Sequence, residues 1–83
     1  MDLHLGQAVV VSGEEILGIF DLDNTSWSYR TREFLERAES QGRVIMAGAD
    51  LPRSMVVCGD GRVYLSQLSS ATLKSRVENG WLE

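Results

Sequence analysis

Two carboxylates stand two residues apart directly after an apolar stretch, in the order Asp21-Leu22-Asp23-Asn24-Thr25. The preceding stretch, residues 16–22, is rich in Ile and Phe and predicts a strand. Two carboxylates at the end of a strand can ligate Mg²⁺, and one of them can attack a phosphoryl group as a nucleophile. The spacing of Asp21 and Asp23 therefore fits phosphoryl-transfer chemistry, provided that the rest of the chain can build the site.

The same spacing resembles the first motif of haloacid-dehalogenase-like phosphatases, in which the first aspartate is the nucleophile and the second the general acid/base. That resemblance implies a doubly wound parallel sheet, in which each βαβ unit needs about 30 residues. Of the 83 residues, 58 follow Thr25, and they carry hairpin signals. Lys74 is the only lysine, and no acidic pair follows it. We therefore expect no enzyme, with Asp21 and Asp23 on the solvent side of a strand.

Metal and thiol chemistry have little support in the sequence, because His4 is the only histidine and Cys58 the only cysteine. A structural zinc site needs four ligands, and a disulfide needs two cysteines. We expect His4 to be a partly buried strand residue and Cys58 a half-buried structural thiol. The sequence predicts no metal, no cofactor and no catalytic residue.

The chain length of 83 residues predicts one domain, spanning residues 1–83. Hydrophobic residues make up 43% of the chain and charged residues 24%, which is typical of a globular protein. A core of this size often needs a disulfide, a metal or self-association to stabilise it. Since the first two are not supported, self-association is the stabiliser that we expect.

The net charge of -4 is unevenly distributed. Residues 1–42 hold eight acids and three bases, a charge of -5, whereas residues 43–83 hold four acids and five bases, a charge of +1, and the two sum to -4. This balance argues against a simple basic nucleic-acid binder. No apolar run approaches the length of a bilayer, and residues 1–4 lack the basic start of a signal peptide. With a single thiol, the expected location is the cytoplasm.

Short β-rich runs bounded by turn residues predict strands at residues 8–11, 16–22, 43–47, 54–58 and 62–66. Ser12-Gly13-Glu14-Glu15 has capping-box spacing but precedes another strand, so it predicts a turn. Gly59-Asp60-Gly61 between the last two strands is the strongest hairpin signal in the chain.

Two helices are expected. Residues 31–41 show an apolar stripe with charged flanks, which predicts a helix with Thr31 as N-cap and Gly42 as a left-handed C-cap. The spacings Arg32–Glu36 and Glu33–Arg37 predict ion pairs on it. Ser69 or Ser70 is expected to cap a last helix that carries Leu73 and Val77 and is closed by Gly80, with Trp81 packing back on its final turn.

The predicted fold class is therefore α+β, in the order two strands, a helix, three strands and a helix. We expect a small, twisted, mainly antiparallel sheet with one long helix packed on it and a short C-terminal helix. The predicted core consists of Ile19, Phe34, Leu35, Ala38, Val44, Met46, Met55, Val57, Val63 and Leu65.

Basic residues are the remaining candidates for a site. Arg53 follows Pro52 in a predicted loop, Arg30 precedes the first helix, and Lys74 and Arg76 lie on the last helix. Arginines in loops beside a rigid sheet can contact phosphates or base edges. The alternative is solvated surface, and for Arg53 the two interpretations have equal weight.

Several segments of the chain together resemble the RemA/RemB family of bacterial extracellular-matrix regulatory proteins. They run in the order Leu3-His4-Leu5-Gly6, Gly18-Ile19-Phe20-Asp21, Thr31-Arg32-Glu33-Phe34-Leu35, Pro52-Arg53-Ser54 and Leu65-Ser66-Gln67-Leu68-Ser69-Ser70-Ala71-Thr72-Leu73-Lys74. The resemblance covers nearly the whole chain, and the last run is the most specific.

The resemblance implies a cytoplasmic DNA-binding transcription regulator of biofilm matrix genes. RemA-like members further imply a fold similar to LytTR-type DNA-binding domains and assembly into rings that present arginines to DNA. The arginine pair of those members would fall at Asp50 and Leu51 here, so only Arg53 is retained nearby. A ring would gather several weak basic loops into one multivalent surface.

Two hypotheses of function follow. The first is a homo-oligomer that binds double-stranded DNA through Arg53 and Arg30, with Arg76 and Lys74 as further contacts. The second is an oligomeric protein-interaction module that binds another regulator, such as a RemA-like protein, and not DNA. In that case exposed aromatic residues such as Trp27, Tyr29 or Trp81 would make the contact.

Overall fold

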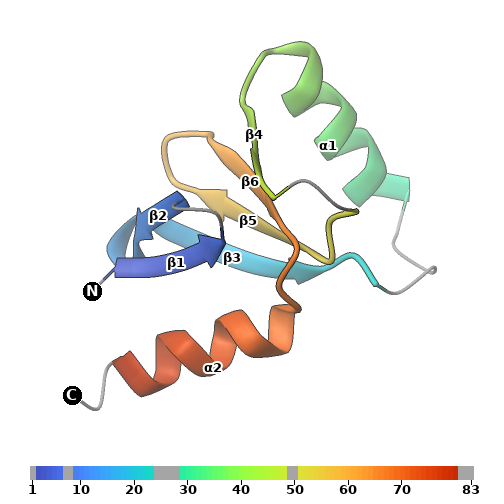
Figure 1. The fold of residues 1–83 in the computed structure, drawn as a ribbon. Coiled ribbons are helices and arrows are strands. Elements are labelled where there is room, and N and C mark those ends of the chain that lie inside the picture. The colour runs from blue at the N-terminus through green and yellow to red at the C-terminus, as the bar shows by residue number, and fades with distance from the viewer. Residues whose placement is uncertain (1, 7–8, 24–28, 49–50, 81–83) are drawn as a thin grey trace.

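The computed structural model describes residues 2–6, 9–23, 29–48 and 51–80. The elements in chain order are β1 (Asp2–Gly6), β2 (Val9–Ser12), the 3₁₀ turn η1 (Gly13–Glu15), β3 (Ile16–Asp21), α1 (Tyr29–Ser40), β4 (Val44–Ala47), β5 (Ser54–Cys58), β6 (Val63–Ser66) and α2 (Ser70–Gly80). The predicted α+β class is confirmed (Figure 1). β1 is not among the predicted strand ranges, although His4, which lies on it, was expected to be a strand residue.

The strands form two sheets. β1 and β2 pair as an antiparallel hairpin, and the other four strands form a sheet in the order β3-β5-β6-β4. Only the β4–β6 pairing is parallel among the pairings of the described residues. The expected mainly antiparallel arrangement is confirmed, although it is divided between two sheets.

The hairpin between β5 and β6 forms at the predicted Asp-Gly step. Gly61 adopts a φ of 96°, a conformation that favours glycine. The Arg62 backbone N–H donates to Asp60 Oδ1 at 3.0 Å, and Cys58 N–H donates to Arg62 O at 2.9 Å. The turn therefore fixes the register of the two central strands, in which Met55 lies opposite Leu65.

Alternation along β5 and β6 divides the core into two clusters on opposite faces of the four-stranded sheet. One face packs against the β1–β2 hairpin and α2, and its buried residues are Leu3, Leu5, Val11, Ala47, Val56, Cys58, Tyr64 and Leu73. The other face packs against α1, and its buried residues are Ala38, Met55, Val63 and Leu65. Figure 1 shows α1 and α2 on opposite sides of the sheet.

The predicted core describes mainly the smaller cluster, under α1. Met55, Val63, Leu65 and Ala38 are buried as expected, but Met46 and Phe34 are exposed by 51% and 36%. Met46 lies on β4, an edge strand of the four-stranded sheet, and Phe34 lies on α1, in which Ala38 is the buried residue. The larger cluster was missed, since it is assembled by β1 and α2, whose packing partners are distant in sequence.

The observed helix bounds differ from two further predictions, the N-cap of the first helix and the length of the last. α1 begins at Tyr29, so Thr31 lies inside its first turn and is not the N-cap. α2 has 11 residues against 12 in α1, so it is not a short appendage. Ser69 is the N-cap of α2, because its Oγ accepts a hydrogen bond from Thr72 N–H at 3.1 Å. Gly42 has the expected left-handed conformation, with a φ of 71°.

Candidate nucleic-acid interface

Arg53, the leading candidate, lies where β5 begins and β3 and β6 end. Its backbone N–H donates to Ser66 O at 2.8 Å, and its carbonyl accepts from Leu22 N–H at 2.9 Å. Arg53 thus lies in the predicted loop, directly before β5, and its backbone hydrogen bonds continue the pairing of β3, β5 and β6. A rigid strand end is a more accurate platform for a contact than a free loop is.

Two buried serines reinforce this end of the sheet. Ser54 Oγ donates to Leu68 O at 2.7 Å, and Ser66 Oγ donates to Leu5 O at 2.7 Å. Both serines are 0% exposed. Ser66 Oγ also accepts from Leu68 N–H at 3.1 Å, so it links β1, β6 and the segment before α2. We call this end, defined by Arg53, Ser54 and Ser66, the Arg53 end.

The Arg53 guanidinium pairs with Asp23, 30 positions earlier in the chain. Its Nε and Nη2 each lie 3.0 Å from Asp23 Oδ2. The side chains are 54% and 44% exposed, so water screens the pair. Asp23 N–H in turn donates to Asp21 Oδ1 at 2.8 Å. Asp21 and Asp23 are therefore joined in a turn after β3, and Asp23 forms the ion pair with Arg53.

Arg30 lies in the first turn of α1 and is exposed. It lines a shallow surface hollow together with Glu33, Phe34 and Arg37. The predicted pair of Glu33 and Arg37 is confirmed at 3.3 Å. α1 carries three arginines and three glutamates, so the helix as a whole has no net charge.

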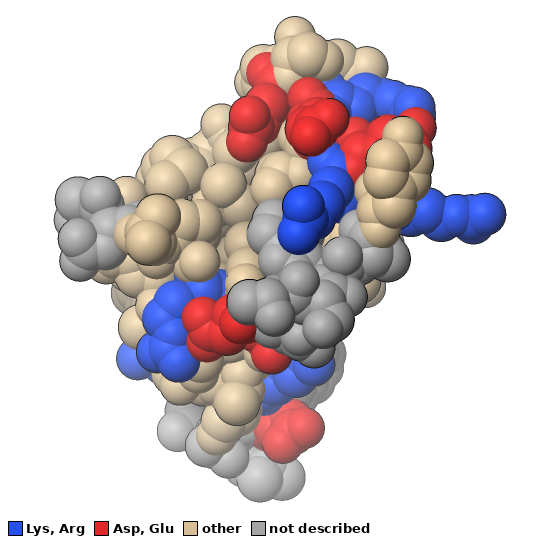
Figure 2. All heavy atoms as spheres, turned by 90° about the vertical axis from the view of Figure 1, so that its right-hand side faces the viewer, with Lys and Arg blue, Asp and Glu red and all other residues tan. Residues whose placement is uncertain are grey.

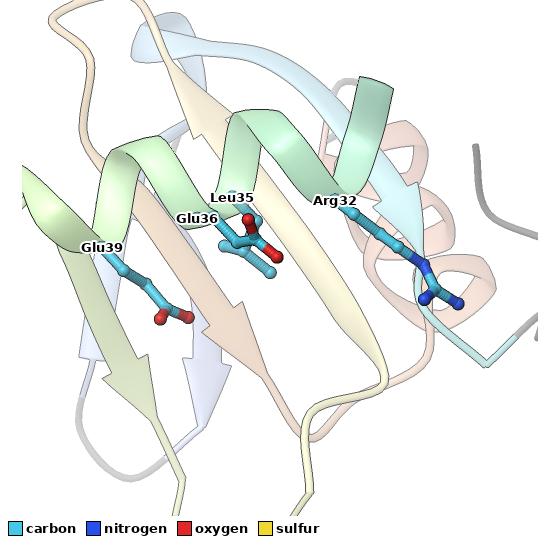
Figure 3. Close-up of a pocket in the computed structure, with 4 residues that line it drawn as sticks. All are labelled: Arg32, Leu35, Glu36 and Glu39. Atoms are coloured by element: carbon cyan, nitrogen blue, oxygen red, sulfur yellow. The ribbon is translucent and has the colours of Figure 1, made fainter. Parts of the chain in front are cut away.

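A second hollow on α1 is lined by Arg32, Leu35, Glu36 and Glu39. Figure 3 shows that Arg32, Glu36 and Glu39 project from the helix over the sheet, with Leu35 behind them. The predicted pair of Arg32 and Glu36 stays a prediction. Two of the three charged side chains here are acidic, which makes this hollow a poor phosphate site.

Lys74 and Arg76 lie on α2, on the opposite side of the sheet from α1. Lys74 is exposed, and Arg76 Nη1 donates to the carbonyl of His4 at 3.2 Å. His4 itself is exposed on β1, which corrects the expectation of partial burial. The sheet thus separates Arg30 from Lys74 and Arg76. Figure 2 shows basic and acidic side chains interleaved on one face.

Two other arginines are committed to the β5–β6 turn. Arg62 donates to Glu15 Oε2 and Asp60 Oδ2, both at 2.6 Å, and to Tyr64 Oη at 2.8 Å. The bonds to Glu15 and then Asp60 raise the pKa of Arg62 above its usual value. Arg43 donates to Gly61 O at 2.5 Å and to Gln41 Oε1 at 2.7 Å.

The thiol of Cys58 is 1% exposed, more deeply buried than expected. Burial raises the pKa of Cys58, with nearby Arg62 opposing the shift. A raised pKa leaves little thiolate at neutral pH, which fits the predicted structural role. Within residues 2–6, 9–23, 29–48 and 51–80, no group of three or more His, Cys, Asp or Glu side chains could hold a metal ion.

Asp23 is the partner of Arg53 that the sequence did not indicate. Its partner Arg53 is 30 residues away, and the β3–β5 pairing brings them together.

Asn24-Thr25-Ser26, Trp27, Asp50 and Trp81 lie outside the described residues. In the described part of the chain, no helix is both long and apolar enough to cross a membrane.

Comparison of the sequence with known proteins places this chain in a family. The sequence model of RemA-like proteins, described as "Extracellular matrix regulatory protein A-like", matches residues 3–77. The chain is also 38% identical over 78 residues to Extracellular matrix regulatory protein B of Bacillus subtilis (strain 168), covering 94% of this chain and 91% of that relative. The matched region includes Arg53, Asp23 and both clusters of the core.

Proposed function

We propose that this chain, which belongs to the RemA-like family of extracellular matrix regulatory proteins, regulates matrix genes by binding DNA as a cytoplasmic homo-oligomer. The observation on which the proposal rests is the position of Arg53. Its backbone is fixed by hydrogen bonds to the ends of β3 and β6, while its guanidinium remains 54% exposed. An exposed guanidinium on a rigid support suits recognition of a phosphate.

One subunit alone offers DNA few favourable charges, which supports an assembly. Arg53 is paired with Asp23, α1 has no net charge, and the chain carries -4. Each arginine that neutralises a phosphate adds a salt-dependent contribution to binding. Several copies would present several Arg53 side chains to one duplex, and the joint binding would exceed that of any one contact.

Arg30, Lys74 and Arg76 remain candidate contacts within this proposal. Arg30 stands at the exposed start of α1, whereas Lys74 and Arg76 lie across the sheet on α2. We keep Arg53 and Arg30 as the first candidate contacts and Lys74 and Arg76 as further contacts.

The test is an electrophoretic mobility shift with duplex DNA from low to moderate salt, on protein whose mass is fixed by light scattering. The proposal predicts an oligomer, a shift that weakens as salt rises, and a weaker shift for Arg53→Ala. Arg37→Ala is the matched control, because Arg37 is also an exposed arginine in an ion pair. A well-formed oligomer that gives no shift even at low salt would refute DNA binding.

A protein-interaction module is the second candidate, and exposed apolar side chains favour it. Leu51, Tyr29 and Leu17 are 87%, 78% and 74% exposed, and Phe20 of β3 is 47% exposed. Such side chains can anchor a protein partner, for example a RemA-like protein. In that case binding would depend little on salt, and Tyr29→Ala or Leu17→Ser would weaken it more than Arg53→Ala would.

A further inference from the structure

We infer that Asp23 is a built-in competitor of DNA phosphate at Arg53, so that DNA binds this arginine fully only after displacing the Asp23 carboxylate. This inference rests on the proposed function and concerns how its leading site is regulated. It starts from one ion pair, between the turn after β3 and the start of β5.

The pair occupies the edge of the guanidinium that a phosphate would use. Nε and Nη2 of Arg53 point to the same oxygen, Asp23 Oδ2, at 3.0 Å each. Arginine binds phosphate through two parallel N–H groups, and the Nε–Nη2 edge is one such fork. A phosphate at this edge and the Asp23 carboxylate are both anions and exclude each other.

Both partners are held in place by their main chains. Arg53 is anchored to Ser66 and Leu22, and Asp23 donates its N–H to Asp21 Oδ1 at 2.8 Å. Asp21 is therefore a positioning residue, which orients the turn that presents Asp23. Because the fold brings the two groups together, the competition is present in every subunit.

The pair is also weak enough to open. Its side chains are about half exposed, and exposed ion pairs of this kind contribute little net stability. A polyanion with several phosphates can displace such a carboxylate, whereas an isolated phosphate gains less. Masking of Arg53 would thus make DNA binding depend on several subunits acting together.

The experiment is a double-mutant cycle on fluorescence anisotropy with a labelled duplex at low salt. The proteins are wild type, Asp23→Asn, Arg53→Ala and the double variant, with Asp2→Asn as control. Asp2 is an exposed aspartate on β1, so this control makes the same change of charge in the other sheet. Circular dichroism and light scattering verify that each variant keeps its fold and mass.

We expect Asp23→Asn to tighten DNA binding about two- to fivefold per site, and more when several subunits bind together. Asp2→Asn is expected to change affinity less than Asp23→Asn does. In the Arg53→Ala background, the Asp23 substitution should have no specific effect. Binding by Asp23→Asn under conditions in which wild type does not bind would also support the inference.

Three outcomes would overturn it. If wild type binds through Arg53 but Asp23→Asn is no tighter, Asp23 is no competitor, while the proposed function stands. If the Asp23 substitution tightens binding equally without Arg53, the effect is one of net charge alone. If neither wild type nor Asp23→Asn binds DNA, the inference and the proposed function fall together.

Discussion

Two arginines lie at opposite ends of the β5–β6 pair and are used in different ways. Arg62, at the hairpin, donates to Glu15, Asp60 and Tyr64, and its side chain is 37% exposed. Arg53, at the other end, has one carboxylate partner and is 54% exposed. Arg62 joins three segments of the fold, whereas Arg53 extends from a segment that is already fixed.

The difference lies in what stabilises each end. At the hairpin, the guanidinium of Arg62 connects η1 to the turn, and its carbon lies 5.7 Å from the centroid of the Tyr64 ring. At the Arg53 end, buried Ser54 and Ser66 and the backbone provide the connections. We therefore expect the Arg53 side chain to contribute little to folding.

The largest expected effect is on the free energy of unfolding, after a substitution at the Arg53 end. Ser66→Ala removes the buried donor to Leu5 O and the acceptor for Leu68 N–H. Leaving buried polar groups unpaired costs about 1–3 kcal/mol for each of the two, so the free energy of unfolding should fall by about 2 kcal/mol or more. Urea unfolding followed by circular dichroism measures it. An unchanged midpoint would show that the serine does not stabilise this end.

The next effect is on binding by Arg53 itself. If the proposed function holds, Arg53→Ala should reduce DNA affinity about tenfold, because it would remove a phosphate contact from each copy in the assembly. Its thermal midpoint should remain close to that of wild type, since it breaks only an exposed ion pair. Anisotropy and thermal melts on the same sample give both values. A large loss of stability would mean that Arg53 is structural after all.

The converse result is expected at the hairpin. Arg62→Ala should lower the free energy of unfolding measurably but by less than Ser66→Ala does, since it removes charge-assisted hydrogen bonds that water partly screens. DNA affinity of the folded protein should not change. Urea unfolding and anisotropy measure the two effects. A loss of DNA binding with unchanged stability would reverse the roles that we assign to the two ends.

The smallest effect is the pH dependence of the hairpin. The hydrogen bond from the Arg62 backbone, followed by its side chain, lowers the pKa of Asp60 below its ordinary value of 3.8. A carboxyl with a lowered folded pKa stabilises the fold above its unfolded pKa and loses this contribution as pH falls through the folded value. Stability should therefore decline below about pH 4.

Asp60→Asn should make that decline shallower, because asparagine keeps the turn but has no charge to titrate. Thermal melts between neutral pH and pH 3 measure the decline. Asp2→Asn provides the matched control, because Asp2 is an exposed aspartate on β1, in the other sheet. Equal acid sensitivity in wild type and Asp60→Asn would show that Asp60 is not the group responsible.

The sequence predicted those parts of the fold that depend on local patterns. The span of β5 was correct at Ser54–Cys58, and the Asp60-Gly61 turn formed as expected. Leu73 and Val77, four residues apart, face the core from α2. Each of these features rests on the spacing of neighbouring residues, which sequence patterns record directly.

The rest depends on contacts between distant segments. β1 alternates exposed and buried residues as a strand should. Its buried residues belong to a cluster that also contains Val56 and Tyr64, which are more than 50 positions away in the sequence. The Arg53–Asp23 pair likewise spans 30 positions and depends on the β3–β5 register. The prediction of Thr31 as the N-cap was wrong because α1 begins two residues earlier, at Tyr29.

We propose that Arg53 contacts DNA and that Arg62 stabilises the fold. The decisive measurement is an anisotropy titration of wild type, Arg53→Ala and Arg62→Ala with one duplex, at low and moderate salt. We expect Arg53→Ala to lose about tenfold in affinity and Arg62→Ala to bind like wild type. Equal affinities for all three proteins, or a loss confined to Arg62→Ala, would contradict it.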